Sequence, residues 1–123
     1  MSEKQTNQKK KLGDASLNEA KKKFNELLVE SILEGLDFGE VVLRFLELKS
    51  QVKRDSIAEK PELFVEKLED LLGVWMAGIF EERILRILCG KLGIEYSVID
   101  ALTFSNAVKK SLKEYLKTCQ NGT

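Results

Sequence analysis

The stretch Gly73-Val-Trp-Met-Ala-Gly-Ile-Phe-Glu-Glu-Arg-Ile-Leu-Arg-Ile-Leu-Cys-Gly-Lys-Leu92 is the longest strongly apolar segment of the chain and carries its only tryptophan. Five charged residues interrupt it, whereas a membrane-spanning helix needs about 20 almost uncharged residues. At about 100° per residue, its apolar side chains form one wide face of an amphipathic helix. We therefore expect residues 74–92 to be the central helix of a small all-α domain.

Composition limits the classes of function. A chain of 123 residues is long enough for one domain with a real core. It has 20 basic and 20 acidic side chains, and this balance weighs against a dedicated nucleic-acid binder. It has no histidine, so the commonest general base and metal ligand is missing. We predict no catalytic residue, no cofactor and no metal site, and hence a protein that is not an enzyme.

The N-terminus and the cysteines bear on localisation. The first residues are polar and contain no apolar signal-peptide core, so we expect a cytoplasmic protein that does not enter a membrane. Cys89 and Cys119 form no Cys-x-x-Cys pattern. They are either a core side chain and a near-terminal thiol, or a disulfide if their helices approach closely.

Apolar periodicity predicts a compact bundle of about five helices around the central one, and no run of residues alternates as a strand would. The expected helices are 16–34, 37–52, 61–72, 74–92 and 103–118. The expected domain organisation is a disordered basic tail over 1–13, a single helical domain over 14–119 and a frayed C-terminus over 120–123.

Helix starts are marked by capping residues. Ser16 with Glu19 forms the S-x-x-E capping box, and Asp37 is expected to cap the second helix. Pro61 occupies the first position of the third helix, where proline is best tolerated. Thr103 is the expected N-cap of the last helix.

Helix stops and faces follow from glycines and periodicity. Gly35, Gly73 and Gly93 are expected to end the first, third and fourth helices. The predicted core-facing stripe of the second helix consists of Phe38, Val41, Val42, Phe45, Leu48 and Val52. Leu43 and Leu46 fall off this stripe, which indicates contact with more than one neighbour. The predicted inward face of the central helix consists of Met76, Ala77, Phe80, Ile84, Ile87, Leu88 and Leu92.

Several motifs in the second half of the chain resemble a known family. They are Lys60-Pro61-Glu62-Leu63-Phe64, Leu68-Glu69-Asp70-Leu71-Leu72-Gly73, and Ile84-Leu85-x-x-Leu88 leading into Lys91-Leu92-Gly93-Ile94-Glu95. The pattern resembles small archaeal helical output domains of the Nitrosopumilus type over about residues 27–116. This resemblance implies a non-enzymatic module, found alone or attached to signalling domains.

Trp75 and Ile79 do not share the inward face of the central helix. On a helical wheel they lie on the opposite side, together with Glu82 and Arg86. An aromatic side chain beside arginine is typical of interface anchors. Either another helix of the monomer covers this stripe, or a second chain does, most simply in a twofold homodimer. We therefore predict a protein-interaction or oligomerisation module.

The alternative function is binding of a nucleic-acid backbone by lysines. The candidate contacts are Lys9, Lys10, Lys11, Lys109, Lys110, Lys113 and Lys117, in the tail and on the outer face of the last helix. Such side chains can follow phosphates. No interleaved aromatic or amide side chains are present to read bases.

Overall fold

The computed structural model describes residues 13–121, and within them it contains α-helices and 3-10 turns but no strand. The elements are α2 (Asp14–Gly35), α3 (Gly39–Ser50), the turn η1 (Arg54–Ser56), α4 (Pro61–Leu72), α5 (Val74–Leu92), the turn η2 (Tyr96–Val98) and α6 (Phe104–Asn121). The predicted all-α bundle is confirmed. The predicted basic tail lies outside the described residues, apart from Gly13.

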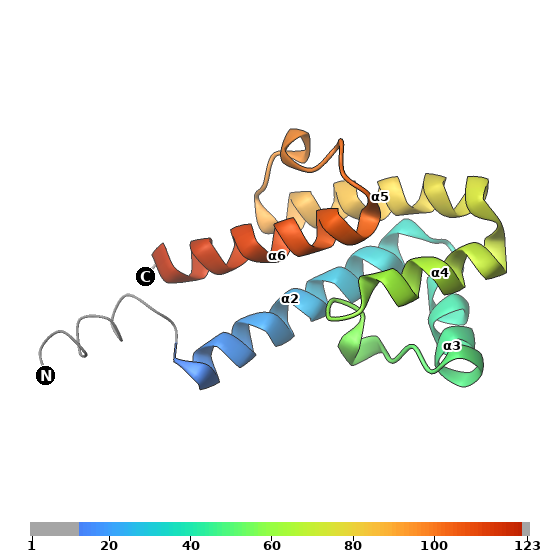
Figure 1. Cartoon of the computed structure of the whole chain (residues 1–123), viewed down its shortest axis with the longest axis horizontal. Coiled ribbons are helices and arrows are strands. Elements are labelled where there is room, and N and C mark those ends of the chain that lie inside the picture. Colours follow the sequence, from blue (N-terminus) through green and yellow to red (C-terminus); the bar gives the residue numbers. More distant parts are fainter. Residues whose placement is uncertain (1–12, 122–123) are drawn as a thin grey trace, which may run out of the picture.

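Two long antiparallel helices, α2 and α5, form the centre of the bundle, and α6 lies along both of them (Figure 1). The predicted central helix α5 packs against α2, α4 and α6. The helix α2 has an equal share in the centre, because it packs against α5, α6, α3 and η1. The short helix α3 and the corner between α4 and α5 lie at one end, and the free ends of α2 and α6 lie at the other (Figure 1).

The core forms along the middle of α5. Ala77, Ile84 and Leu88 are buried, as predicted. Leu85 and Cys89 are also buried, although they lie outside the predicted face. Met76, which was predicted to face inward, is 47% exposed. The reason is that the first turns of α5 lie at the end of the bundle, where fewer helices surround them.

Where local chemistry determines a boundary, the predicted boundaries agree with the structure. The bounds of α4 and α5 are as predicted, and Gly73 and Gly93 have φ angles of 87° and 72°, a region that favours glycine. The N–H of Asn106 donates to Oγ1 of Thr103 over 3.3 Å, as the predicted cap requires. The helix α6 continues to Asn121, so the predicted end of this helix at residue 118 is wrong, and Gln120, which was expected to be frayed, is helical.

Two predicted caps are wrong. Ser16 and Glu19 lie inside α2, which begins at Asp14 after Gly13, and no side chain caps it. Asp37 does not cap α3 either, because α3 begins two residues later. In both places the first turn of the helix is closed by a backbone hydrogen bond. The N–H of Leu17 donates to the carbonyl oxygen of Gly13, and the N–H of Val42 donates to the carbonyl oxygen of Phe38.

Gly35 is the last residue of α2, but its role differs from the predicted one. It does not adopt a left-handed conformation. A Cβ at this position would lie 3.2 Å from Cγ1 of Ile84, so the absence of a side chain lets α2 and α5 approach closely. Arg83 of α5 donates to the carbonyl oxygen of Gly35 over 3.1 Å and fixes the same contact.

The predicted core face of α3 is wrong. Val42 and Val52 of the predicted stripe are buried, but Leu43 and Leu46 are the other residues that α3 turns inward. The remaining four are exposed, namely Phe38 at 41%, Val41 at 68%, Phe45 at 40% and Leu48 at 78%. The helix has two apolar faces, so periodicity alone could not decide which one meets the core.

Both cysteines are free thiols, with Cys89 buried and Cys119 half-buried.

The tight α2–α3 turn gives the first prediction. A Cβ at Gly39 would lie 3.0 Å from the carbonyl oxygen of Ile32 and from Cα of Leu33, which are backbone atoms. We expect Gly39→Ala to lower the free energy of unfolding by about 1–3 kcal/mol, measured by urea denaturation. Gly90→Ala is the matched control, since a Cβ at Gly90 would meet no neighbouring side chain or other helix within 4 Å. Because Gly90 is helical and exposed, this variant should be more stable than the wild type by about 0.5–1 kcal/mol. Equal stability of the two variants would contradict the close packing at Gly39.

Candidate functional site

The four residues predicted for an interface all lie on the exposed side of α5. Trp75 is 89% exposed and Ile79 is 55% exposed. Glu82 and Arg86 are also exposed and form an ion pair of 3.0 Å with each other. The interpretation that another helix of the monomer covers Trp75 and Ile79 is therefore wrong.

Trp75 belongs to a larger apolar surface, which we call the apolar end. It consists of Phe38, Val41, Phe45, Leu48, Leu71, Val74, Trp75, Met76 and Ile79, all of which are at least one-third exposed. The first four residues belong to α3 and the turn before it, and the other five surround the α4–α5 corner. Both groups lie at the end of the molecule away from the free ends of α2 and α6 (Figure 1).

An aromatic contact joins the two parts of the apolar end. The rings of Phe38 and Phe80 meet edge to face, with their centroids 5.6 Å apart. Phe80 is half-buried and lies one helical turn after Met76. The guanidinium of Arg83 lies 5.4 Å from the centroid of the Phe80 ring. Phe38 therefore adjoins the side of α5 that carries Met76 and Phe80, while Trp75 and Ile79 lie on the other side of the same corner.

The corner projects because the chain reverses there through a single residue. Gly73 ends α4 and precedes α5 directly, and its φ of 87° suits a residue without a Cβ. Of the six residues that follow, Ala77 alone is buried. The first two turns of α5 thus expose apolar side chains on most sides.

The α3 part of the apolar end was missed as a functional candidate. The available signal was that Leu43 and Leu46 fell off the regular stripe, which meant that α3 has more apolar surface than one contact needs. The structure buries those two residues and leaves the stripe exposed.

Glu81 follows the apolar end on α5 and is half-buried. Its Oε2 is buried and has no hydrogen-bond partner among the described residues. Burial, and then the negative charge of Glu69 on α4, raise the pKa of Glu81 to about 7. The carboxyl group therefore disfavours the folded state when it is ionised.

Arg86 also contacts the connection that follows α5. Its guanidinium lies 4.2 Å from the centroid of the Tyr96 ring in η2, in addition to its pair with Glu82. These contacts hold the far end of the predicted stripe in place. The uncommitted part of the stripe is therefore Trp75 and Ile79.

The predicted nucleic-acid contacts are only partly available. Lys109 pairs with Glu62 of α4, and Lys117 with Glu114 over 3.4 Å. Lys110 and Lys113 are exposed and form no ion pair with a residue in the range 13–121. Lys9, Lys10 and Lys11 lie outside the described residues.

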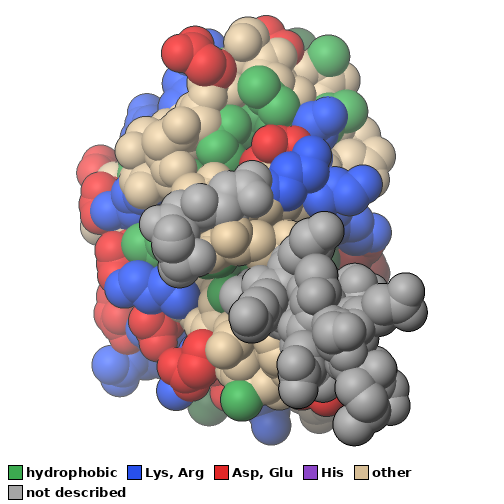
Figure 2. All heavy atoms as spheres, turned by 90° about the vertical axis from the view of Figure 1, so that its left-hand side faces the viewer, with side chains coloured by type: hydrophobic (Ala, Val, Ile, Leu, Met, Phe, Trp, Pro, Cys, Tyr) green, Lys and Arg blue, Asp and Glu red, His purple; other side chains and the backbone are tan. Residues whose placement is uncertain are grey.

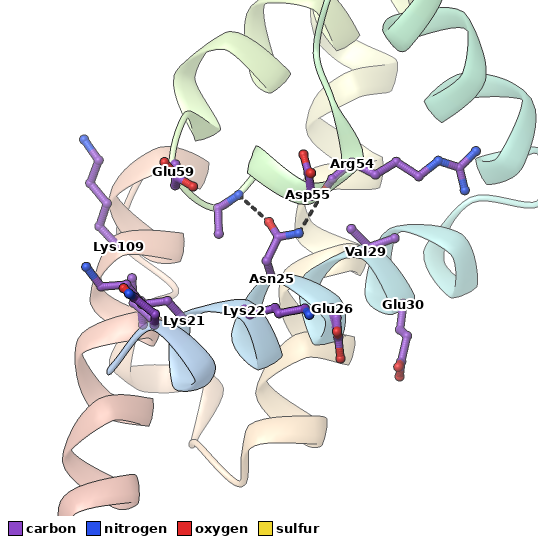
Figure 3. A pocket seen from close by; sticks show the side chains of 13 residues that line it. Lys21, Lys22, Asn25, Glu26, Val29, Glu30, Arg54, Asp55, Glu59 and Lys109 are labelled. Atoms are coloured by element: carbon purple, nitrogen blue, oxygen red, sulfur yellow. Dashed lines mark hydrogen bonds between the residues drawn. The ribbon is translucent and has the colours of Figure 1, made fainter. Parts of the chain in front are cut away.

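A groove of about 1040 Å³ lies between α2, the segment around η1 and α6 (Figure 3). Lys21, Lys22 and Lys109 line it together with acidic side chains, so its charges are mixed. On its floor, Asn25 donates to the carbonyl oxygen of Arg54 over 2.7 Å and accepts from the N–H of Ala58 over 2.8 Å. This amide is used to attach the segment around η1 to α2.

The surface at the other end of the molecule has a different character. Figure 2 views that end and shows lysine, arginine, aspartate and glutamate side chains spread over it, with small apolar areas between them. The largest exposed apolar side chains are instead concentrated at the apolar end.

Comparison with protein-family models, with curated proteins and with solved structures finds no significant match to this chain. The resemblance to archaeal output domains therefore stays a prediction. No helix within residues 13–121 is long and apolar enough to cross a membrane. The same residues contain no group of three or more Cys, Asp or Glu side chains arranged to hold a metal ion.

Glu81 gives the second prediction, which concerns pH. Because its pKa rises from 4.5 in the unfolded chain to about 7 in the folded protein, its contribution to stability is fully present below pH 4.5 and is lost as the pH rises through 7. We expect Glu81→Gln to be more stable than the wild type by about 1 kcal/mol at pH 8, allowing for solvent screening, with the difference vanishing near pH 4.

Urea denaturation of both proteins between pH 4 and pH 8 measures this difference. Glu82→Gln is the matched control, since Glu82 is exposed and paired with Arg86. A stability difference for Glu81→Gln that stays constant over the whole pH range would contradict the raised pKa.

Proposed function

We propose that this protein is a helical self-association module whose apolar end docks onto the same surface of a second copy. The observation that carries the proposal is the 89% exposure of Trp75 within a cluster of other exposed apolar side chains. Single exposed apolar residues are normal on soluble proteins, but large contiguous groups mark interaction sites.

The size of the surface supports an interface with another protein. Nine apolar side chains lie at this end of the molecule, each between 38% and 89% exposed, whereas exposed apolar side chains on a monomer are normally scattered singly. A stable interface buries about 800 Å² on each partner. The apolar end would supply the centre of such an interface.

Its composition fits the centre of an interface. Tryptophan, phenylalanine and methionine are enriched at interface centres, and charged residues are depleted there. The apolar end contains Trp75, Met76, Phe38 and Phe45. Because Trp75 lies on a helix, its backbone is already ordered before the interface forms.

The charge distribution supports a second copy as the partner. The chain carries 20 basic and 20 acidic residues, so two copies have no net repulsion. Residues near the apolar end carry both signs, with Arg44 beside Glu40 and Arg83 beside Glu82. A twofold interface brings a patch against itself, and a mixed border can then pair with itself.

The resemblance to output domains extends this proposal, since the module would pass its assembly state to a signalling partner. The alternative function, binding of a phosphate backbone, has less support because Lys109 and Lys117 are already paired with glutamates. The enzyme class has no supporting observation in the described residues.

Trp75→Glu gives the third prediction. It places a charge at the centre of the proposed interface, so we expect the dimer of the wild type to become monomeric in sedimentation analysis. Folding should change by no more than about 0.5 kcal/mol, because the side chain is exposed in the monomer. In the wild type, the emission of the single tryptophan should shift to the blue with increasing concentration as Trp75 is covered.

The matched control is Val98→Glu, which alters an exposed apolar residue of η2, beyond the opposite end of α5 from the corner. This variant should dimerise like the wild type. A wild type that stays monomeric at the highest concentration, with no change in emission, would overturn the proposed function.

A further inference from the structure

The exposed stripe of α3 has the spacing of a helix-pairing seam. Val41, Phe45 and Leu48 of α3, preceded by Phe38 at the N-cap position, are separated by three, four and three residues, the repeat of the a and d positions in a coiled coil. All four are exposed, between 40% and 78%. A seam of this kind fits the equivalent seam of another helix better than a sheet or an irregular loop.

The other two sides of α3 are already occupied. Val42, Leu43 and Leu46 face the core, and α3 packs against α2. On the polar side, Glu40 and Glu47 both pair with Arg54. The stripe is therefore the side of α3 that remains for a partner.

The Arg54 contacts also fix the rotation of α3. Arg54 donates two hydrogen bonds to the carboxylate of Glu40, and it holds the pKa of Glu40 down at about 2. The N–H of Arg54 donates to Glu47 as well. The stripe is thus presented by a helix whose orientation is set from two sides, which reduces the entropy lost on pairing.

We infer that the second copy docks by antiparallel pairing of α3 with its own equivalent, an inference that rests on the proposed self-association. In this arrangement Phe38 faces Leu48 of the second copy, and Val41 faces Phe45. Every layer then joins one phenylalanine to one aliphatic side chain, so the layers have similar volumes. Parallel pairing would stack Phe38 on its equivalent and Val41 on its equivalent, which gives uneven layers.

Electrostatics favours the same direction. Asp37 lies before the N-terminus of α3, and Lys49 lies in its last turn. Neither forms an ion pair within residues 13–121. Antiparallel pairing brings Asp37 to the level of Lys49 of the second copy and opposes the two helix dipoles, whereas parallel pairing would bring like charges together.

The α4–α5 corner takes part in the same interface. Phe38 contacts Phe80, so the corner lies beside the N-terminal end of the stripe. Antiparallel pairing then places this side of the corner near Leu48 at the C-terminal end of the other stripe. Leu48 is the most exposed side chain of the stripe, at 78%.

Spin labels test the direction of pairing, and this is the fourth prediction. Labels are attached in a Cys119→Ser background at Arg44→Cys or at Lys49→Cys, while buried Cys89 is left in place. With the twofold axis at the level of residue 43, the labels are offset along the helix by about 3 Å at position 44 and about 18 Å at position 49. We expect a clearly shorter distance at position 44 in electron paramagnetic resonance. Equal distances at both positions would overturn antiparallel pairing.

Leu48→Glu separates this inference from the proposed function. We expect it to raise the dissociation constant of the dimer by about tenfold or more while the monomer stays folded by circular dichroism. If Leu48→Glu dimerises like the wild type while Trp75→Glu is monomeric, pairing through α3 is wrong and self-association through the corner stands. If both variants dimerise like the wild type, or if the wild type is monomeric, both proposals fall.

Discussion

The contact between α2 and α5 is the constraint on which the rest of the structure depends. The two helices approach closely at Gly35, where a Cβ would lie only 3.2 Å from Cγ1 of Ile84. Arg83 secures this point through the carbonyl oxygen of Gly35, and Lys91, two turns later on α5, pairs with the neighbouring Glu34 over 2.6 Å. Because these polar contacts are partly exposed, they set the register of the two helices more than they add stability.

The closeness of α2 and α5 decides where apolar surface remains. The helix α3 follows α2 through a turn so tight that Gly39 lies against the backbone of the preceding helix. That turn sets the rotation of α3, and the core accepts only the face with Leu43 and Leu46. The other apolar face, beginning at Phe38, is left outside next to the projecting α4–α5 corner. The apolar end is thus a consequence of the packing at the centre.

The candidate site was predictable only in part. The position of Trp75 and Ile79 opposite the core face followed from one helical wheel, because α5 is long and its inward face is wide. The exposure of Met76 was not predictable, since it results from the end of the bundle and not from the helix itself. The raised pKa of Glu81 was not predictable either, because it depends on burial and on Glu69 of a different helix. Such effects arise between elements that are distant or angled in space, and periodicity carries no information about them.

The sequence by itself determined that the chain is all-α, and it determined the bounds of α4 and α5, because Pro61, Gly73 and Gly93 act through their own backbone geometry. It also determined the cap at Thr103, which acts on a residue three positions later. Only the tertiary structure decided how Gly35 works and which apolar face of α3 is buried. The physical reason is that α3 offers two apolar faces of similar quality, and the free energy of burying either one depends on the neighbour that the α2–α5 packing leaves beside it.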